Sequence, residues 1–187
     1  MNNYRFLKFL LIALVLSPLI VTAQEEEGDD HEKEEQHRHS IGLTLSHSFI
    51  GKGLNEDGGR KIITVPSWGL KYNYHINEKW AIGWHNDLLI ERFVIERPEE
   101  EGGSLERNFP IASLIMASHA LGDKGWGFSF GAGIEWEENE NFGVIRAGLE
   151  YAVELPKKWE VVFEGNYDIM IEAYDSFTLG ICIYKLF

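Results

Sequence analysis

The sequence predicts an all-β fold: an eight-stranded antiparallel up-and-down transmembrane β-barrel, preceded by a signal peptide and a disordered acidic linker. Three observations predict it. Apolar residues make up 44% of the 187 residues, with 13% aromatics, 19 Gly and only 5 Pro, which is typical of β proteins with tight turns and interfacial aromatics. From Ile41 onward, apolar and polar residues alternate with period two. The alternating segments are long enough for the ~9–11 tilted residues that cross a bilayer.

Residues 1–23 have the pattern of a secretory signal peptide. Arg5 and Lys8 precede an apolar stretch from Phe9 to Leu16, and residues 21–23 (Val-Thr-Ala) supply small side chains at the cleavage positions. An uncleaved membrane helix is the alternative, but the apolar run is shorter than the ~20 residues that a helical span needs. We therefore expect the rest of the chain to be exported.

Residues 24–40 form an acidic linker without a large apolar side chain. Such a segment buries nothing and is expected to be disordered. One interpretation is a solvated spacer. The other is a tail that binds Zn²⁺ or Cu²⁺ weakly through His31, His37 and His39, because imidazole suits both metals. No spacing here matches a rigid tetrahedral site, so any metal binding by the tail is expected to be weak. We expect no other cofactor.

Eight strands are expected in the barrel domain, residues 41–187. Trp126 to Glu137 is the clearest case, with large apolar side chains at every second position. Short turns at 76–79, 122–125 and 156–158 alternate with connections that include long loops at 51–61 and 96–107, as in outer-membrane barrels. The expected strands are 40–50, 62–75, 80–95, 107–120, 126–136, 142–155, 159–171 and 176–187.

Tryptophan recurs at the same place after each short turn, close behind a Lys. Indole rings prefer the headgroup layer, so these residues are expected at one membrane level; a soluble core capped by Trp is the alternative. The expected aromatic girdle comprises Trp80, Trp126, Trp159, Tyr151 and Phe187 on the short-turn side and Trp136 on the opposite side.

Alternation alone does not show which face of the strands lines the barrel interior and which lies on its outside. The alternative is a soluble, lipocalin-like periplasmic barrel that binds a hydrophobic ligand in an apolar interior. The polar face mixes Gly, Ser and Ala with charged residues. Because the narrow interior of an eight-stranded barrel must be filled by side chains, this mixture favours a polar lumen and a lipid-facing exterior.

Counting back from the turn at 156–158 predicts which charges meet in the lumen. Glu154 should oppose Glu160, Glu150 should oppose Glu164, and Arg146 should oppose Asp168. Like charges directly opposite are unfavourable, so these carboxylates need cations, shared protons or a bound ion. The expected lumen charge network comprises Lys71, Asp87, Glu135, Arg146, Glu150, Glu154, Glu160, Glu164 and Asp168. The alternative for these residues is a cation site or an acid–base pair.

No enzymatic site is expected. The close His–Ser neighbours are residues 46–48 (Ser-His-Ser) and 118–119 (Ser-His), and adjacent strand residues point to opposite faces, so the wall splits each pair. His47 and His119 are expected at the membrane interface, and His75 and His85 in the lumen. A net charge of −13 offers no basic face to nucleic acid. Cys182, the single cysteine, cannot form an internal disulfide and is expected to fill the lumen.

Two expected strands fit the pattern poorly. Asn86 interrupts an apolar face, and the alternation slips near Glu91, which a β-bulge would explain. Segment 109–121 is apolar on both faces, with Leu114 on one and Ile115 on the other, so the pattern does not assign its outward face.

The signal peptide, the eight alternating strands and the final Phe187 resemble the small OmpA/OmpX-type, porin-like outer-membrane barrels over residues 41–187. The resemblance implies the outer membrane of a Gram-negative-type cell, contact with outer-membrane lipids and lipopolysaccharide, and insertion by the assembly machinery through the C-terminal strand. Lys185 departs from the apolar pattern of that strand, and snorkelling to the interface would accommodate it. The expected role is structural, surface interaction through loops 51–61 and 96–107, or narrow passage of small solutes or ions.

Overall fold

The computed structural model describes residues 38–54, 59–96, 103–122 and 124–187. The predicted signal peptide and residues 24–37 of the predicted linker lie outside this part of the chain. Within it, no helix is long and apolar enough to cross a membrane. The strands are β1 His39–Leu54, β2 Arg60–His75, β3 Trp80–Leu89, β4 Arg92–Glu96, β5 Ser104–Asn108, β6 Ile111–Ala120, β7 Trp126–Trp136, β8 Phe142–Leu155, β9 Trp159–Met170 and β10 Asp175–Leu186.

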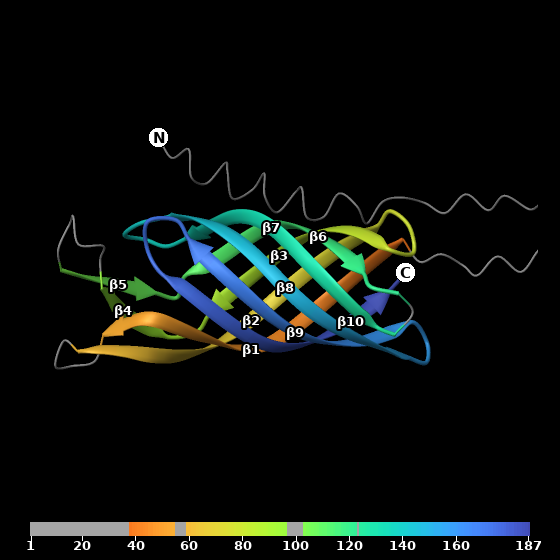
Figure 1. Cartoon of the computed structure of the whole chain (residues 1–187), viewed down its shortest axis with the longest axis horizontal. Helices are drawn as coiled ribbons and strands as arrows, with labels where there is room; N and C mark the ends of the chain where they lie inside the picture. Colours follow the sequence, from red (N-terminus) through yellow and green to blue (C-terminus); the bar gives the residue numbers. More distant parts are fainter. Residues whose placement is uncertain (1–37, 55–58, 97–102, 123) are drawn as a thin grey trace, which may run out of the picture. The chain divides into compact units, whose positions relative to one another are not determined.

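Eight of these strands close into an antiparallel barrel, as predicted (Figure 1). Around the wall the order is β1, β2, β3, β6, β7, β8, β9 and β10. β10 pairs with β1 in an unbroken register from Ser40↔Leu186 to Ile50↔Ser176, so the wall has no free edge. We call the end with residues 76–79, 122–125 and 156–158 the short-turn end, and the opposite opening the mouth.

The remaining strands, β4 and β5, form a hairpin that leaves the wall and crosses the mouth. β3 ends at Leu89, and β4 pairs with β5 throughout. Gly53 of β1 pairs with Lys61 of β2 on one side and with Ile95 of β4 on the other, the side that β10 occupies nearer the short-turn end. The expected strands 80–95 and 107–120 are thus each divided in two.

This arrangement replaces the β-bulge expected near Glu91. The β2–β3 register is regular up to Leu89, and the chain then breaks so that β4 can turn over the opening. The irregularity in this region lies instead in β1, where the pairing with β2 shifts between Ile50 and Gly53.

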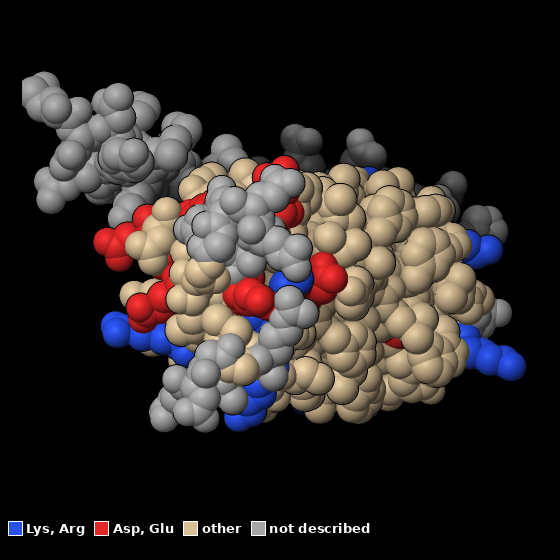
Figure 2. Space-filling model, turned by 60° about the vertical axis from the view of Figure 1, so that its left-hand side comes forward, with Lys and Arg blue, Asp and Glu red and all other residues tan. Residues whose placement is uncertain are grey.

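The apolar faces of the strands point outward and the polar faces point inward. Leu43, Leu45 and Leu70 are each more than half exposed, whereas Lys71 and Arg146 are buried in the lumen. Figure 2 shows a flank almost free of charge, with Lys, Arg, Asp and Glu gathered at the two ends. The lipocalin-like alternative, with an apolar interior, is therefore wrong.

An apolar core lies at the mouth, beneath the β4–β5 hairpin. It explains the segment that is apolar on both faces: Leu114 and Met116 point inward and belong to this core, while Ile111 and Ile115 are exposed outside. The cluster comprises Ile50, Val65, Leu89, Phe93, Ile95, Leu105, Ala112, Leu114, Met116, Phe142, Val144, Met170, Ala173 and Tyr174.

Candidate functional site

The first layer of the candidate site, counted from the mouth, centres on Arg107 of β5, whose side chain is fully buried. Its guanidinium donates to Glu135 Oε1 at 2.5 Å, to Glu137 Oε2 at 3.4 Å and to the carbonyl of Glu140 at 2.6 Å. The guanidinium carbon also lies 4.7 Å from the ring centre of Phe142, a cation–π contact. A buried charge needs such partners, because desolvation costs several kcal/mol per ion. The sequence placed Glu135 in the network but missed Arg107, which it assigned to the boundary between a loop and a strand.

The turn between β9 and β10 completes this layer. The Tyr174 hydroxyl donates to Glu135 Oε2 at 2.6 Å, and burial raises the pKa of the Tyr174 phenol well above its ordinary value, helped by the nearby carboxylate of Glu135. The ring of Phe93 in β4 meets the ring of Tyr174 edge-on at 6.0 Å. Lys52 donates to the carbonyl of Ala173 at 2.9 Å. Hairpin, turn and wall are therefore joined by polar as well as apolar contacts.

Arg146 dominates the second layer. Its Nε and Nη2 donate to the two carboxylate oxygens of Asp168 at 2.6 and 2.7 Å, the bidentate fork that suits a guanidinium. Its Nη1 donates across the lumen to Asp87 of β3. β8 and β9 place Arg146 opposite Asp168, in agreement with the count from the turn. The contact with Asp87 links β8 to β3, which are not neighbouring strands. Counting residues back from a turn therefore could not predict it.

Lys71 forms the third layer by pairing with Glu164 across the lumen. Both side chains are buried, and Glu164 faces Glu150 in the β8–β9 register. Lys71 therefore compensates the charge of Glu164, one member of the pair of facing carboxylates that the sequence predicted. Beside it, His85 Nε2 lies 2.9 Å from the side-chain oxygen of Asn73, so His85 is a lumen residue as predicted.

Glu154 and Glu160 face each other at the short-turn end, as the register predicted. Among the ion pairs of the described residues, none involves either carboxylate. Glu154 is exposed and Glu160 is partly exposed, so water at this opening solvates them. The lumen charges thus separate into three layers, each with its own cation, and an acidic rim that forms no ion pair among the described residues.

Between the third layer and that rim, side chains fill the lumen. Cys182 is a fully buried free thiol, which agrees with its predicted role as a filler, and it packs with Val162 and Tyr184. The Tyr184 ring lies directly over Gly42, where a Cβ would come within 2.5 Å of the ring. The absence of a side chain at residue 42 is what lets the phenol occupy this level.

The predicted girdle residues all lie on the outer surface. Trp80, Trp126 and Trp159 begin the strands that follow the three short turns and are about two-fifths exposed. The ring of Tyr151 lies 5.0 Å from that of Trp126, and Phe187 is exposed at the same end. Trp136 ends β7 and is exposed near the mouth.

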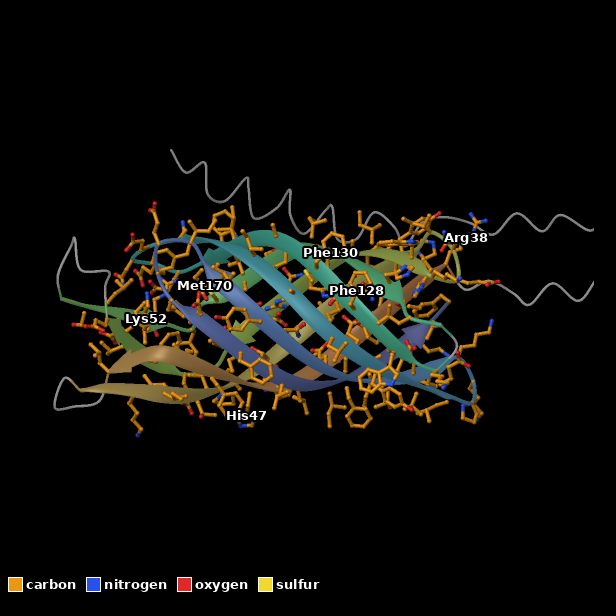
Figure 3. All side chains as sticks on the ribbon, in the orientation of Figure 1. Arg38, His47, Lys52, Phe128, Phe130 and Met170 are labelled. Carbon is orange, nitrogen blue, oxygen red and sulfur yellow. The ribbon has the colours of Figure 1, made fainter. Side chains whose placement is uncertain are left out.

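The His–Ser neighbours are split by the wall, as predicted. Ser46 and Ser48 face the lumen and hydrogen-bond Ser67 and Thr178 at 2.7 and 2.8 Å, whereas His47 points away from the barrel (Figure 3). His119 lies against the ring of Trp80, with 4.3 Å between ring centres.

Of the three histidines proposed as metal ligands, only His39 belongs to the described residues. It begins β1, and its Nδ1 lies 2.8 Å from the Tyr72 hydroxyl, so at least one of its ring nitrogens is engaged within the barrel. His31 and His37 lie outside the described part, and metal binding by the tail stays a prediction. His75 faces the lumen rim, with Nε2 3.1 Å from Ser40 Oγ.

Comparison with known proteins supports the fold. No family model and no curated protein matches the chain. Among solved structures, Neisserial surface protein A superposes with a TM-score of 0.52 at 10% identity, covering 80% of this chain and 97% of that one. Ail of Yersinia pestis gives 0.45 at 11% identity, covering 80% and 99%. The N-terminal barrel of Pseudomonas aeruginosa OprF gives 0.40 at 10% identity, covering 80% and 99%. The predicted resemblance to small outer-membrane barrels is confirmed at the level of the fold.

Proposed function

We propose that this protein is an integral outer-membrane barrel whose lumen is closed, and that it acts as a membrane-anchored structural and surface-interaction protein. The single observation that carries the proposal is the β4–β5 hairpin across the mouth. Phe93, Ile95 and Leu105 of the hairpin are buried in the apolar core beneath it, and buried Arg107 joins it to the wall.

The layers below the hairpin support the same conclusion. Arg146 spans the lumen between Asp87 and Asp168, and Lys71 spans it to Glu164. A solute would have to displace each of these buried ion pairs, and breaking one costs about 3–5 kcal/mol. Eight strands enclose an interior just wide enough for side chains, whereas water-filled porins have about 16–18 strands.

The hairpin also supplies the surface for interaction. Its outward residues are exposed, among them Arg92 and Glu106, and Arg92 Nε donates to the Asn108 side chain at 2.9 Å. Loops on a rigid scaffold are where binding residues concentrate. Because β4 and β5 are packed from below, this surface is held in place before any partner arrives.

The test is conductance of the purified protein in a planar lipid bilayer. We expect no steady current from the native chain. A triple variant, Phe93→Ser, Ile95→Ser and Leu105→Ser, should loosen the hairpin, and a heat-dependent shift on an SDS gel would verify that the barrel itself still folds. A stable, ion-selective current through the native protein would overturn the proposal of a closed barrel.

A second candidate is narrow passage of cations or protons. The observation that favours it is the column of ionisable side chains from Glu160 and Glu150 through Glu164 to Asp168 and Glu135, all of which lie on lumen positions of β7, β8 and β9. This candidate predicts a native current that Glu164→Gln changes by severalfold. The surface-interaction proposal predicts no current in either protein.

A further inference from the structure

Asn86 is the polar side chain that interrupts the apolar face of β3, and the structure places it on the outer surface of the wall. Its chain neighbours His85 and Asp87 are buried in the lumen, and successive strand residues point to opposite faces. Trp80 begins β3 at the short-turn end, and Asn86 follows six positions later. With a rise of about 3.3 Å per residue along a tilted strand, Asn86 lies well inside the apolar band, which is about 25 Å tall.

The side-chain amide of Asn86 has no hydrogen-bond partner among the described residues. In the sheet it stands between Leu70 of β2, which is apolar, and Ser113 of β6. The Ser113 hydroxyl is engaged by the indole N–H of Trp84, which donates to it at 2.8 Å. Lipid chains supply neither donors nor acceptors, so an amide at this depth is left unsatisfied by the surrounding bilayer.

Short polar side chains and a surrounding apolar ring make up this part of the outer wall. Asn86 and Ser113 are only partly exposed, whereas Leu70 and Ile115 beside them are 55% and 58% exposed. Short side chains let two membrane-embedded walls approach closely, and polar side chains between them form hydrogen bonds. We call this surface the β3–β6 patch, and it comprises Leu70, Asn86, Leu88, Ser113, Ile115 and Ile134.

We propose that the β3–β6 patch is the contact surface of a homodimer in the membrane, with two Asn86 side chains hydrogen-bonded to each other. A two-fold axis brings the same patch of both copies together. Each Asn86 amide then donates an N–H to the oxygen of its counterpart and accepts one in return, while the apolar rings pack around the pair. The inference rests on the barrel spanning a membrane and goes beyond the proposed closure of its lumen.

Charge complementarity selects a second copy of this chain over other occupants of the patch. The partial charges of an amide, positive at N–H and negative at oxygen, complement those of a second amide turned to face it. An acyl chain carries no such charges, and lipid headgroups stay at the interfaces, which Trp80 and Trp136 mark at the two ends of the wall. A charged side chain from another protein would need a counter-charge, and the patch contains none.

The test measures association of the purified full chain in liposomes by energy transfer between copies that carry a donor or an acceptor dye. The dyes are attached at Lys124→Cys, an exposed position of the turn between β6 and β7. Cys182 is fully buried and stays unlabelled. We expect energy transfer that rises with the protein-to-lipid ratio. Asn86→Leu should raise the ratio at half-maximal transfer about tenfold, on the scale of one or two hydrogen bonds between membrane segments.

Two variants separate the Asn86 pair from general effects of a changed outer wall. His47→Leu removes another outward polar side chain, on β1, and should leave energy transfer unchanged. Asn86→Gln keeps the amide and should associate more strongly than Asn86→Leu. Asn86→Leu places an apolar side chain against lipid, so the barrel should fold at least as well as the native one, and the heat-dependent shift on an SDS gel verifies this.

Disulfide formation then maps the contact surface in chains that keep Asn86. Leu88→Cys, the next outward position of β3, should link two copies, whereas Leu179→Cys on β10, across the barrel from β3 and β6, should not. The proposal is overturned if the native protein shows no concentration-dependent transfer, in which case Asn86 faces lipid or a different protein. It is also overturned if Asn86→Leu associates as readily as the native chain, if His47→Leu weakens association equally, or if the two cysteine variants cross-link alike.

Discussion

Arg107 and Glu135 form a fully buried ion pair, with 2.5 Å between Nη2 and Oε1. One residue belongs to the β4–β5 hairpin and the other to the barrel wall, so this pair holds the cover of the mouth to its rim. The other links between the hairpin and the rest of the barrel are the contacts of Arg107 with Glu137 and with the carbonyl of Glu140, the apolar packing, and the pairing of Gly53 with Ile95.

The first prediction concerns this pair. Arg107→Met leaves Glu135 buried with Tyr174 as its hydrogen-bond donor, so the free energy of unfolding should fall by about 3–5 kcal/mol. Denaturant titration in detergent, followed by Trp fluorescence, measures the change. Adding Glu135→Met should recover much of the loss, because it removes the uncompensated charge. Arg92→Ala, at an exposed position of the same hairpin, should change stability by no more than about 0.5 kcal/mol.

The second prediction separates charge from geometry in the middle of the lumen. Arg146→Lys keeps the positive charge but cannot fork onto Asp168 and reach Asp87 at the same time. We expect a loss of about 1–3 kcal/mol in the free energy of unfolding, since hydrogen bonds between buried charged groups are lost. The matched control is Arg92→Lys, whose hydrogen bond to Asn108 lies at the surface. Equal effects of the two substitutions would contradict the assigned role of the fork.

The third prediction uses the close approach of Tyr184 to Gly42. Gly42→Val places two methyl groups against the ring, and overpacking of this kind costs about 1–3 kcal/mol. Tyr184→Ser removes the ring, so the double variant should be more stable than the sum of the two single effects implies. Gly51→Ala is the control, because its added Cβ meets nothing within 4 Å. Strict additivity at residues 42 and 184 would argue against the contact.

The fourth prediction concerns depth in the membrane. Three single-Trp proteins that retain Trp80, Trp126 or Trp159 should be quenched to the same extent by lipids brominated at one acyl position, because the three indoles follow equivalent turns. A fourth protein retains only Trp68. Its register partner Leu45 lies several residues away from the short-turn end of β1, so Trp68 should be quenched best by a label deeper in the bilayer. Different depths for the three interfacial residues would contradict the girdle.

Period-two alternation predicted the eight barrel strands. Together with the need to fill a narrow lumen, it predicted the outward faces, except in segment 109–121, which is apolar on both faces. It also predicted the register of β8 and β9, since a three-residue turn fixes how Arg146 meets Asp168. The alternation did not reveal the break after Leu89, because apolar residues continue to alternate in β4. There they pack into the apolar core beneath the hairpin and not onto the wall. The sequence analysis placed Lys71 and Glu164 in the lumen network without pairing these two residues specifically, and it missed Arg107. Contacts across a lumen depend on the closed ring and not on neighbouring strands.

Ser48 of β1 and Thr178 of β10 are hydrogen-bonded at 2.8 Å although 130 residues separate them in sequence. During synthesis, β1 is made long before β10 exists, and the backbone of β1 remains an exposed pairing edge for that whole interval. Contacts so distant in sequence form slowly. The seam therefore makes closure of the barrel depend on a late step, the arrival of the last strand beside the first.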